Sequence, residues 1–242
     1  MQSKNWIRCA ILNLLLIQCF LLPGFGQLKS KTLDLNAEVS WKYLLYLPKE
    51  YDQKGEQIYP LLLFLHGGGE SGTSINKVKK HGPPAQIVSG REFPFILLAP
   101  QNPHKRRLWD DTAVMLLLDE IVEQYRVDRN RVYLSGLSRG AYGAWRLAVQ
   151  YPDRFAALIA ISGEAPMNYA RWIEDLPIWV FHGDSDKSID VSSSKRMVES
   201  LRQSGNRAKL TIYTDTGHDA WTRTYDNPDV YKWMLEQRRS TK

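Results

Sequence analysis

A serine stands between two glycines in the segment Gly136-Leu137-Ser138-Arg139-Gly140. Residues 131–135 before it form a β-branched and aromatic run that predicts a strand, whereas residues 141–149 after it predict a helix. A sharp strand-to-helix turn exposes the serine hydroxyl at the helix N-terminus, where free N–H groups and the helix dipole favour a developing negative charge. Ser138 is therefore the candidate nucleophile of an acyl-transfer reaction. The alternative interpretation is a glycine-rich connection with an incidental serine.

Acyl transfer passes through a tetrahedral oxyanion that needs two hydrogen-bond donors already in place. The backbone N–H of Arg139, the residue after the serine, is expected to supply one of them. The sequence His-Gly-Gly-Gly at residues 66–69 directly follows an apolar run and offers the second. Gly68 or Gly69 can bring its amide close because neither has a Cβ atom. An ordinary glycine turn is the alternative.

A general base and an acid must complete such a site. In hydrolases with this kind of turn, the acid and then the histidine follow the serine along the chain. Three of the five histidines precede Ser138 and His182 lies within the candidate acid segment, which leaves His218, just after the last predicted strand. The acid must come from residues 181–190. Three aspartates compete there, and spacing does not separate them: Asp184, Asp186 and Asp190.

The elements that must position these residues alternate between strands and helices. A continuous apolar run such as Leu61 to Leu65 is typical of a strand buried on both faces. Strand–helix alternation predicts a largely parallel sheet covered on both sides, with ligands bound beyond the carboxyl ends of the strands. Strands are expected at residues 31–35, 41–47, 61–65, 95–99, 131–135, 156–161, 178–181 and 209–213, and helices at 112–125, 141–149, 192–203 and 228–238.

The length of 242 residues and the hydrophobic content of 43% suit one globular domain with a sizeable core. The formal net charge is +6, and no long stripe of lysine and arginine is present, so a nucleic-acid partner is not expected. No motif indicates a metal or an organic cofactor.

Residues 1–26 have the pattern of a secretory signal peptide, which leaves residues 27–242 as the catalytic domain. Lys4 and Arg8 precede an apolar run, and small residues, Gly24 and Gly26, precede the expected cleavage site. The run is short for a membrane anchor, so we expect a secreted or periplasmic protein without stable membrane association after cleavage.

Both cysteines, Cys9 and Cys19, fall within residues 1–26, so the mature chain would contain no thiol and no disulfide. Lipidation at Cys19 is the alternative, but Gln18 before it is too large for the usual lipobox.

Four segments together resemble the lid-less α/β-hydrolase carboxylesterases, including the dienelactone-hydrolase, phospholipase/carboxylesterase and secreted bacterial "predicted peptidase" groups. The resemblance runs from about residue 44 to residue 238 and implies a single-domain α/β-hydrolase fold without a large lid. The segments are His66-Gly67-Gly68-Gly69-Glu70-Ser71-Gly72, Gly136-Leu137-Ser138-Arg139-Gly140, His182-Gly183-Asp184-Ser185-Asp186 and Gly217-His218-Asp219.

The resemblance implies that Asp186 is the acid, while Asp184 forms a turn and Asp190 caps the following helix. Arg139 departs from the methionine often found after the nucleophile, which changes the pocket wall but leaves the backbone donor intact. Trp109 and Trp221 are expected to line the substrate site, with plain core packing as the alternative. Glu70 and the basic run Lys105-Arg106-Arg107 are expected to be solvated loop charges.

The expected function is that of a secreted serine carboxylesterase acting on small-molecule or polysaccharide-borne esters, with acetyl and feruloyl esters as the leading substrates. A prolyl-oligopeptidase-like peptidase is the first alternative, although such peptidases usually carry a gating domain for which this length leaves no room. A catalytically silent binding protein is the second alternative, because a fold alone does not fix a function.

Overall fold

The computed structural model describes residues 27–35, 39–52 and 54–239. The expected signal peptide at residues 1–26 lies outside the described residues, as do both cysteines.

Within the described residues, one sheet contains eight strands: β1 (Gln27–Leu35), β2 (Val39–Leu47), β3 (Tyr59–Leu65), β4 (Ile96–Pro100), β5 (Val127–Leu137), β6 (Ala157–Ile161), β7 (Ile178–Gly183) and β8 (Lys209–Tyr213). Their order is β1-β2-β4-β3-β5-β6-β7-β8. β2 is antiparallel to both β1 and β4, whereas every pair from β4 to β8 is parallel. The mostly parallel sheet of the α/β-hydrolase fold is thereby confirmed.

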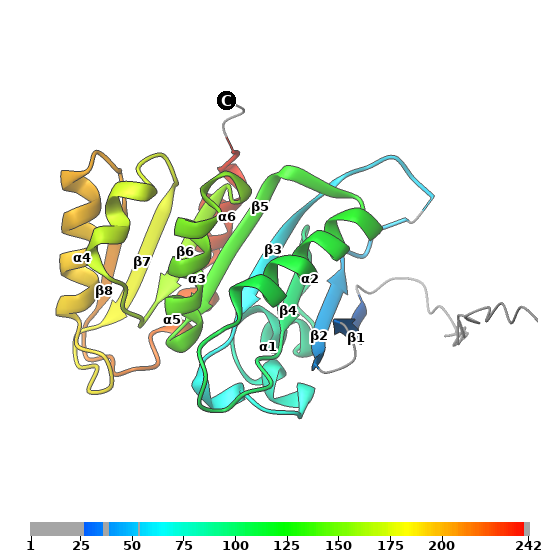
Figure 1. Cartoon of the computed structure of the whole chain (residues 1–242), viewed down its shortest axis with the longest axis horizontal. Helices are drawn as coiled ribbons and strands as arrows, with labels where there is room; N and C mark the ends of the chain where they lie inside the picture. Colours follow the sequence, from blue (N-terminus) through cyan, green and yellow to red (C-terminus); the bar gives the residue numbers. More distant parts are fainter. Residues whose placement is uncertain (1–26, 36–38, 53, 240–242) are drawn as a thin grey trace, which may run out of the picture.

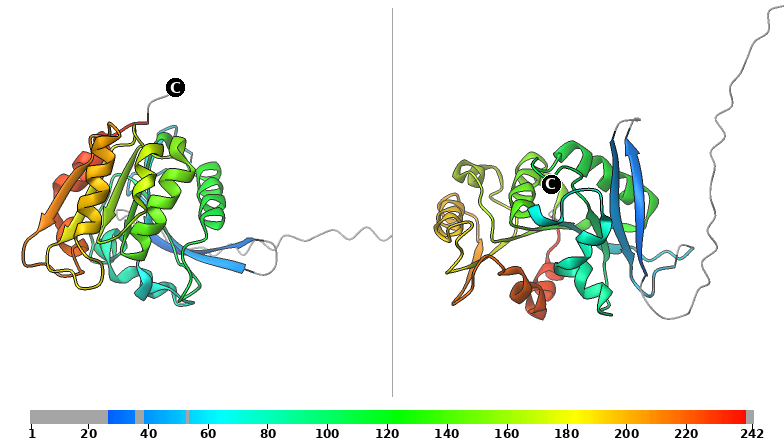
Figure 2. Two further views of the ribbon diagram at one scale, coloured as in Figure 1. Left: turned by 60° about the vertical axis from the view of Figure 1, so that its left-hand side comes forward. Right: turned by 90° about the horizontal axis from the view of Figure 1, so that it is seen from below.

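Helices cover both faces of the sheet (Figures 1 and 2). One face carries α2 (Asp111–Gln124), α3 (Arg139–Gln150) and α4 (Ser192–Gln203), and the other carries α1 (Gly82–Val88), α5 (Trp221–Asp226) and α6 (Pro228–Glu236). Every residue of β3 and β4 is buried, as expected for central strands covered on both sides.

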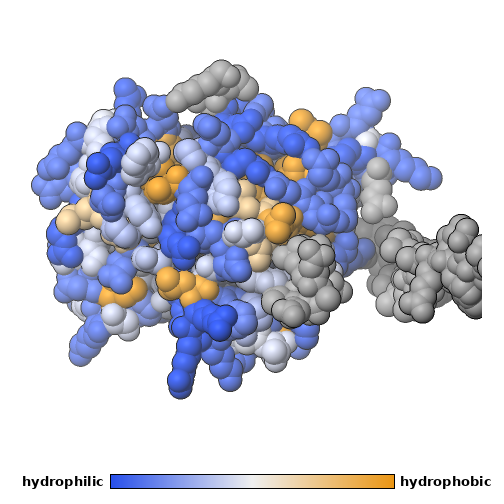
Figure 3. All heavy atoms as spheres, viewed as in Figure 1, coloured by the Kyte–Doolittle hydropathy of each residue, from blue (hydrophilic) through white to orange (hydrophobic). Residues whose placement is uncertain are grey.

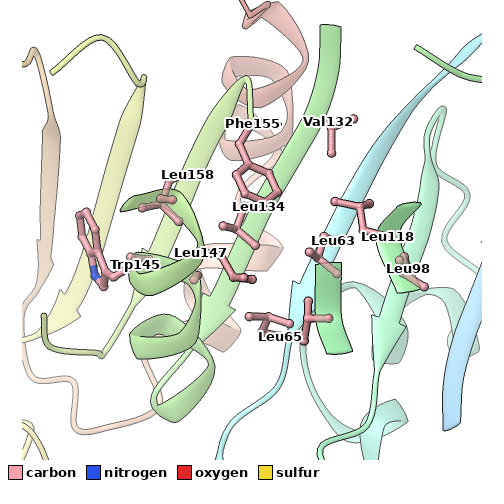
Figure 4. Close-up of a cluster of buried hydrophobic side chains, with 14 of the residues drawn as sticks. Leu63, Leu65, Leu98, Leu118, Val132, Leu134, Trp145, Leu147, Phe155 and Leu158 are labelled. Carbon is pink, nitrogen blue, oxygen red and sulfur yellow. The ribbon is translucent and has the colours of Figure 1, made fainter. Parts of the chain in front are cut away.

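Each face has its own hydrophobic core. Figure 4 shows part of the larger one, in which Leu63, Leu134 and Leu158 of the strands gather with Leu118 of α2 and Leu147 of α3. The second core lies beneath α1, α5 and α6. Burial of these side chains holds the sheet rigid, so the loops that leave its carboxyl edge start from fixed positions.

Four elements differ clearly from the expectation, and one of them, β1, starts at Gln27 instead of residue 31. β5 starts at Val127, four residues earlier than the apolar run indicates, because Val127 already pairs with Tyr59 of β3. α1 and α5 are not anticipated by the sequence analysis. α1 begins with Gly82-Pro83-Pro84, where prolines are tolerated because the first helical N–H groups have no partner in the helix. α5 has six residues, too few for a clear periodic pattern.

The surface in Figure 3 is mostly hydrophilic, with hydrophobic side chains in small scattered groups. Among the residues that the structure describes, no helix is both long and apolar enough to cross a membrane. The same residues contain no cluster of three histidine, cysteine or acidic side chains that could hold a metal ion.

Candidate active site

The turn between β5 and α3 holds Ser138 in a backbone conformation that L-amino acids rarely adopt. Its φ is 52° and its ψ is −121°, and α3 begins at the next residue. The Ser138 N–H donates to the carbonyl of Ile161 at 2.8 Å, and the Ser138 carbonyl accepts from Ala141 at 2.9 Å. These two hydrogen bonds hold Ser138 in its strained conformation. Strained backbone conformations of this kind are common at functional sites.

The two glycines of the motif allow this turn for steric reasons. A Cβ atom at Gly136 would overlap the carbonyl oxygen of Gly140, and a Cβ atom at Gly140 would overlap the carbonyl oxygen of Leu65 in β3. The backbone of the helix therefore passes directly over the end of the neighbouring strand. No larger residue fits at either position without moving the backbone.

Three of the predicted residues form one hydrogen-bonded row. The Ser138 hydroxyl lies 2.9 Å from His218 Nε2, and His218 Nδ1 lies 2.7 Å from Asp186 Oδ2. The carboxylate can only accept, so Nδ1 carries the ring hydrogen and Nε2 is left to accept the serine proton. The three residues come from the loops after β5, β7 and β8, whose carboxyl ends meet at one edge of the sheet.

Asp186 is ionised and held rigidly. Burial of its carboxylate works to raise its pKa, but hydrogen bonds from His218 and from the backbone N–H groups of Ile189 and Ser188 together lower that pKa below its ordinary value. The two backbone bonds measure 2.8 and 3.0 Å and both reach Oδ1, which leaves Oδ2 for the histidine. The same bonds distinguish Asp186 from its two exposed neighbours.

The side chain of His182 contacts the Asp186 carboxylate, which the sequence analysis does not anticipate. Its buried ring places Nε2 3.1 Å from Asp186 Oδ2 and 2.9 Å from the carbonyl of Ile189, while Nδ1 lies 2.7 Å from the Ser194 hydroxyl. Nε2 faces two acceptors and therefore carries the hydrogen. The spacing of four residues between His182 and Asp186 is the only sequence signal of this contact.

The three glycines after His66 have different surroundings. The Cβ position of Gly67 lies 3.5 Å from Ser138 Cβ, so this residue lies beside the candidate nucleophile. The Cβ position of Gly68 lies 2.8 Å from Arg139 Nη2, and that of Gly69 has no neighbour within 4 Å. This glycine loop, residues 67–69, therefore lies against both Ser138 and Arg139.

Glu70 is buried, so the expectation of a solvated carboxylate is wrong. It is 7% exposed, and its oxygens lie 3.6 Å from His81 Nε2 and 4.0 Å from His66 Nδ1. His81 in turn packs against Trp221, and Trp221 packs edge-on against His218, with ring centroids 5.6 and 5.2 Å apart. A chain of contacts thus links the glycine loop to the proposed base. The contacts of Glu70 arise from the way the loop folds onto itself, which the spacing of charges in the sequence does not report.

The two tryptophans expected to line the substrate site differ in burial. Trp221 is half-buried at the surface beside His218. Trp109 is only 2% exposed and packs against His66 and Gly143. Its ring is therefore part of the core and is not exposed to a substrate. The alternative of core packing therefore describes Trp109.

His66 anchors the glycine loop as a neutral side chain. Burial lowers its pKa to about 4, with a smaller opposing effect from its hydrogen bond to the Gly67 carbonyl. Its Nδ1–H donates to that carbonyl at 2.7 Å, and its Nε2 accepts from the Asn102 N–H at 3.0 Å. His66 thereby joins the loop after β3 to the loop after β4.

Proteins named as esterases resemble this chain in sequence. A bifunctional acetylxylan esterase/xylanase of Neocallimastix patriciarum, XynS20E, is 26% identical over 180 residues, which is 72% of this chain and 26% of the relative. The putative esterase NocK of Nocardia uniformis is 36% identical over 140 residues, which is 52% of this chain and 40% of the relative. The matched region thus spans less than half of each of these relatives.

Solved structures and a family profile point the same way. A thermostable esterase superposes with a TM-score of 0.77 at 30% identity, covering 88% of this chain and 63% of that one. The ferulic acid esterase of Anaeromyces mucronatus superposes with a TM-score of 0.67 at 15% identity, covering 88% of this chain and 91% of that one, which shows a shared fold. Residues 93–227 match the profile of the Phospholipase/Carboxylesterase family. The chain, an α/β-hydrolase with esterases among its relatives, therefore belongs to the phospholipase/carboxylesterase family.

Proposed function

We propose that this protein is a serine carboxylesterase in which Ser138, His218 and Asp186 form the catalytic triad. The observation that carries the proposal is the row of two hydrogen bonds, 2.9 and 2.7 Å long, that begins at a serine on a strained turn. This arrangement matches the geometric requirements for a nucleophile, a base and an orienting carboxylate.

In the proposed reaction, Ser138 Oγ attacks the ester carbonyl carbon while His218 Nε2 takes the hydroxyl proton. The positive charge that develops on the imidazole is stabilised by the Asp186 carboxylate, which stays ionised. His218 then gives the proton to the departing alcohol, which leaves an acyl-enzyme. Water then attacks the acyl carbon while one of its protons passes to His218, and His218 returns that proton to Ser138 Oγ as the carboxylic acid leaves.

The oxyanion of each tetrahedral intermediate would be held by backbone N–H groups of Arg139 and of the glycine loop. Of the two loop residues expected to donate, Gly68 has the better support because it lies against Arg139, whereas the space beside Gly69 is open. Trp221, beside the proposed base, is the aromatic side chain placed to contact a substrate.

Ester-linked acetyl or feruloyl groups on soluble or polysaccharide substrates are the proposed targets. Acetylxylan esterases recur among the relatives, including acetylxylan esterase A of Emericella nidulans, which is 31% identical over 85 residues, 29% of this chain and 28% of that relative. The connection from β6 to β7 contains only a short 3-10 helix, Met167–Trp172, among regular elements, so it places no long helix over the carboxyl edge of the sheet.

The test combines substitution, labelling and a substrate panel. Wild-type protein should react with a fluorophosphonate and hydrolyse p-nitrophenyl acetate, while Ser138→Ala should do neither, with kcat lower by several orders of magnitude. Ester turnover by Ser138→Ala within tenfold of wild type would refute the mechanism. Failure of wild-type protein to react with the fluorophosphonate would instead favour a silent binding module.

The panel contains p-nitrophenyl esters from acetate to palmitate, methyl ferulate, acetylated xylan and a prolyl peptide amide. Short acyl chains should be preferred, and acetylated xylan or methyl ferulate should be cleaved. A preference for long acyl chains would indicate a lipase, and amide cleavage at the rate of the esters would indicate a peptidase.

Export is part of the proposal and rests on the sequence of residues 1–26. The mature protein should begin at Gln27, which mass spectrometry of the exported chain will test. An intact mass that retains Met1 would contradict cleavage.

A further inference from the structure

The guanidinium group of Arg139 lies beside the proposed oxyanion site. Its Nη2, Cζ and Nε atoms lie 2.8, 3.0 and 3.3 Å from the Cβ position of Gly68. Gly67, one residue earlier, faces Ser138. The glycine loop thus has the nucleophile beside one residue and a cationic side chain against the next. A side chain larger than hydrogen at residue 68 would displace that guanidinium.

Among the residues that the structure describes, only one nitrogen of this guanidinium has hydrogen-bond partners. Nη1 donates to the Lys105 carbonyl at 2.8 Å, and more weakly to the Ser71 hydroxyl and the Arg107 carbonyl at 3.4 and 3.5 Å. Among the described residues, no carboxylate lies within ion-pair distance of Arg139, and no acceptor is bonded to Nη2 or Nε. The edge formed by Nε and Nη2 carries the two parallel N–H groups that match a carboxylate.

The acidic residue nearest in the loop does not neutralise Arg139. The Glu70 carboxylate faces His81 and His66 instead. The bonds of Nη1 hold the guanidinium against the loop, so the charge is positioned but not compensated. Arg139 is half-exposed, which leaves it accessible from solvent.

The charges around the carboxyl edge of the sheet divide into two halves. The segments after β3 and β4 are predominantly basic, with Lys77, Lys79, Lys80, Lys105, Arg106 and Arg107 against Glu70 and Asp110. The segments after β6, β7 and β8, up to the next strand or α-helix, are predominantly acidic, with Glu164, Glu174, Asp175, Asp184, Asp186, Asp190, Asp215 and Asp219 against Arg171 and Lys187. Arg139 lies on the basic half, so an anionic group of a substrate is attracted to that side of Ser138.

We infer that the Arg139 guanidinium binds a carboxylate of the substrate, which makes the enzyme selective for esters that carry a carboxylate near the scissile bond. The inference rests on the proposed esterase function and deepens it. The carboxylate can belong to the alcohol, as in an acetylated hydroxy acid or uronic acid, or to the acyl group, as in the half-ester of a dicarboxylic acid. Both present the same planar anion to the guanidinium.

Two pairs of substrates of matched shape test the inference. O-acetylglycolate and O-acetylglycolamide differ in the charge on the alcohol side, and monomethyl glutarate and methyl glutaramate differ in the charge on the acyl side. Initial rates of ester hydrolysis give kcat/KM for each, and the readout is the ratio of anionic to neutral substrate within a pair. A ratio removes any change in the chemical step that a substitution next to the nucleophile causes.

Wild-type protein should prefer the anionic member of one pair by about tenfold or more, and the pair concerned identifies which side of the ester faces Arg139. A hydrogen bond between charged groups contributes about 1.5–3 kcal/mol, so Arg139→Gln should lower the ratio roughly 10- to 100-fold. Arg139→Lys should give an intermediate ratio because it keeps the charge but loses the two-pronged donor. Arg207→Gln, which removes an exposed charge remote from the carboxyl edge, should keep the wild-type ratio.

Failure of this inference is distinguishable from failure of the proposed function. Hydrolysis of p-nitrophenyl acetate that depends on Ser138, together with a wild-type ratio near one in both pairs, would overturn the role of Arg139 and leave the esterase intact. An unchanged ratio in Arg139→Gln would overturn it as well, provided that thermal unfolding shows a folded variant. Ester hydrolysis that is independent of Ser138 would refute the esterase mechanism itself.

Discussion

Three aspartates within seven residues differ in what their carboxylates contact. Asp186 accepts two backbone N–H groups and faces His218, whereas Asp184 accepts the Ser185 hydroxyl and Asp190 accepts the N–H of Ser192 at the start of α4. Asp184 and Asp190 are exposed and Asp186 is buried. These contacts explain why sequence spacing leaves the acid undecided: it is the fold that gives one of three similar residues its partners.

Asp186→Asn is therefore expected to lower kcat by about 10⁴-fold, because an amide can donate to His218 and favour the wrong tautomer. Asp184→Asn and Asp190→Asn should each stay within about threefold of wild type, since an asparagine amide oxygen can still accept the hydrogen bonds from Ser185 and Ser192. Steady-state kinetics with p-nitrophenyl acetate will measure all three. A larger loss in either exposed variant than in Asp186→Asn would assign the acid to another residue.

The residues that sequence reasoning misjudges are those whose environment is set by distant parts of the chain. Trp109 lies in the core because Gly143 of α3 leaves room for its ring, and Glu70 is buried with its carboxylate facing His66 and His81. Composition and local spacing contain neither fact. Ser138 is different, because its two flanking glycines are a local requirement of the turn and are therefore visible in sequence.

At the scale of elements, the apolar strands are predicted well and the short helices are not. β3, β4 and β7 are nearly continuous hydrophobic runs, since both of their faces are covered. β8 and α4 match their expected bounds, whereas α1 and α5 are too short for periodicity to identify. Tertiary packing, not intrinsic propensity, stabilises helices of this length.

The backbone of α3 lies very close to the end of β3 at Gly140, and this contact gives a prediction about stability. Gly140→Ala places a methyl group on the carbonyl oxygen of Leu65, so the free energy of unfolding should fall by about 3 kcal/mol or more. Chemical denaturation will measure this change, and the absence of a cooperative transition counts as the same result. Gly217→Ala, whose Cβ position has no neighbour within 4 Å, is the matched control and should change stability by less than about 1 kcal/mol.

Retention of wild-type stability by Gly140→Ala would show that the helix can move away from β3. The close approach of the two backbones would then be a preference of the fold and not a requirement. If Gly140→Ala and Gly217→Ala lowered the free energy of unfolding by similar amounts, the cause would instead be the general replacement of glycine near the site.

At the scale of the whole molecule, the carboxyl edge of the sheet is assembled around buried groups whose protonation is coupled to folding. His66 joins the loops after β3 and β4, and burial lowers its pKa to about 4 from an ordinary value of 6.5. The unfolded chain therefore binds a proton near pH 6.5, whereas the folded protein does not bind it until about pH 4. Folding stability must decrease as the pH falls through this interval, and is fully present above it.

A difference of this size corresponds to about 3 kcal/mol, at 1.36 kcal/mol for each pKa unit. Urea denaturation between pH 7.5 and pH 4.5 should show wild-type stability falling more steeply than that of His66→Gln, so the two curves converge at acidic pH. Asp111, whose pKa is raised by burial, contributes with the opposite sign, but it does so equally in both proteins and cancels from the comparison. Parallel curves for wild type and His66→Gln would show that His66 binds a proton equally well in the folded and the unfolded protein. The hypothesis that a buried, neutral His66 holds the glycine loop would then be wrong.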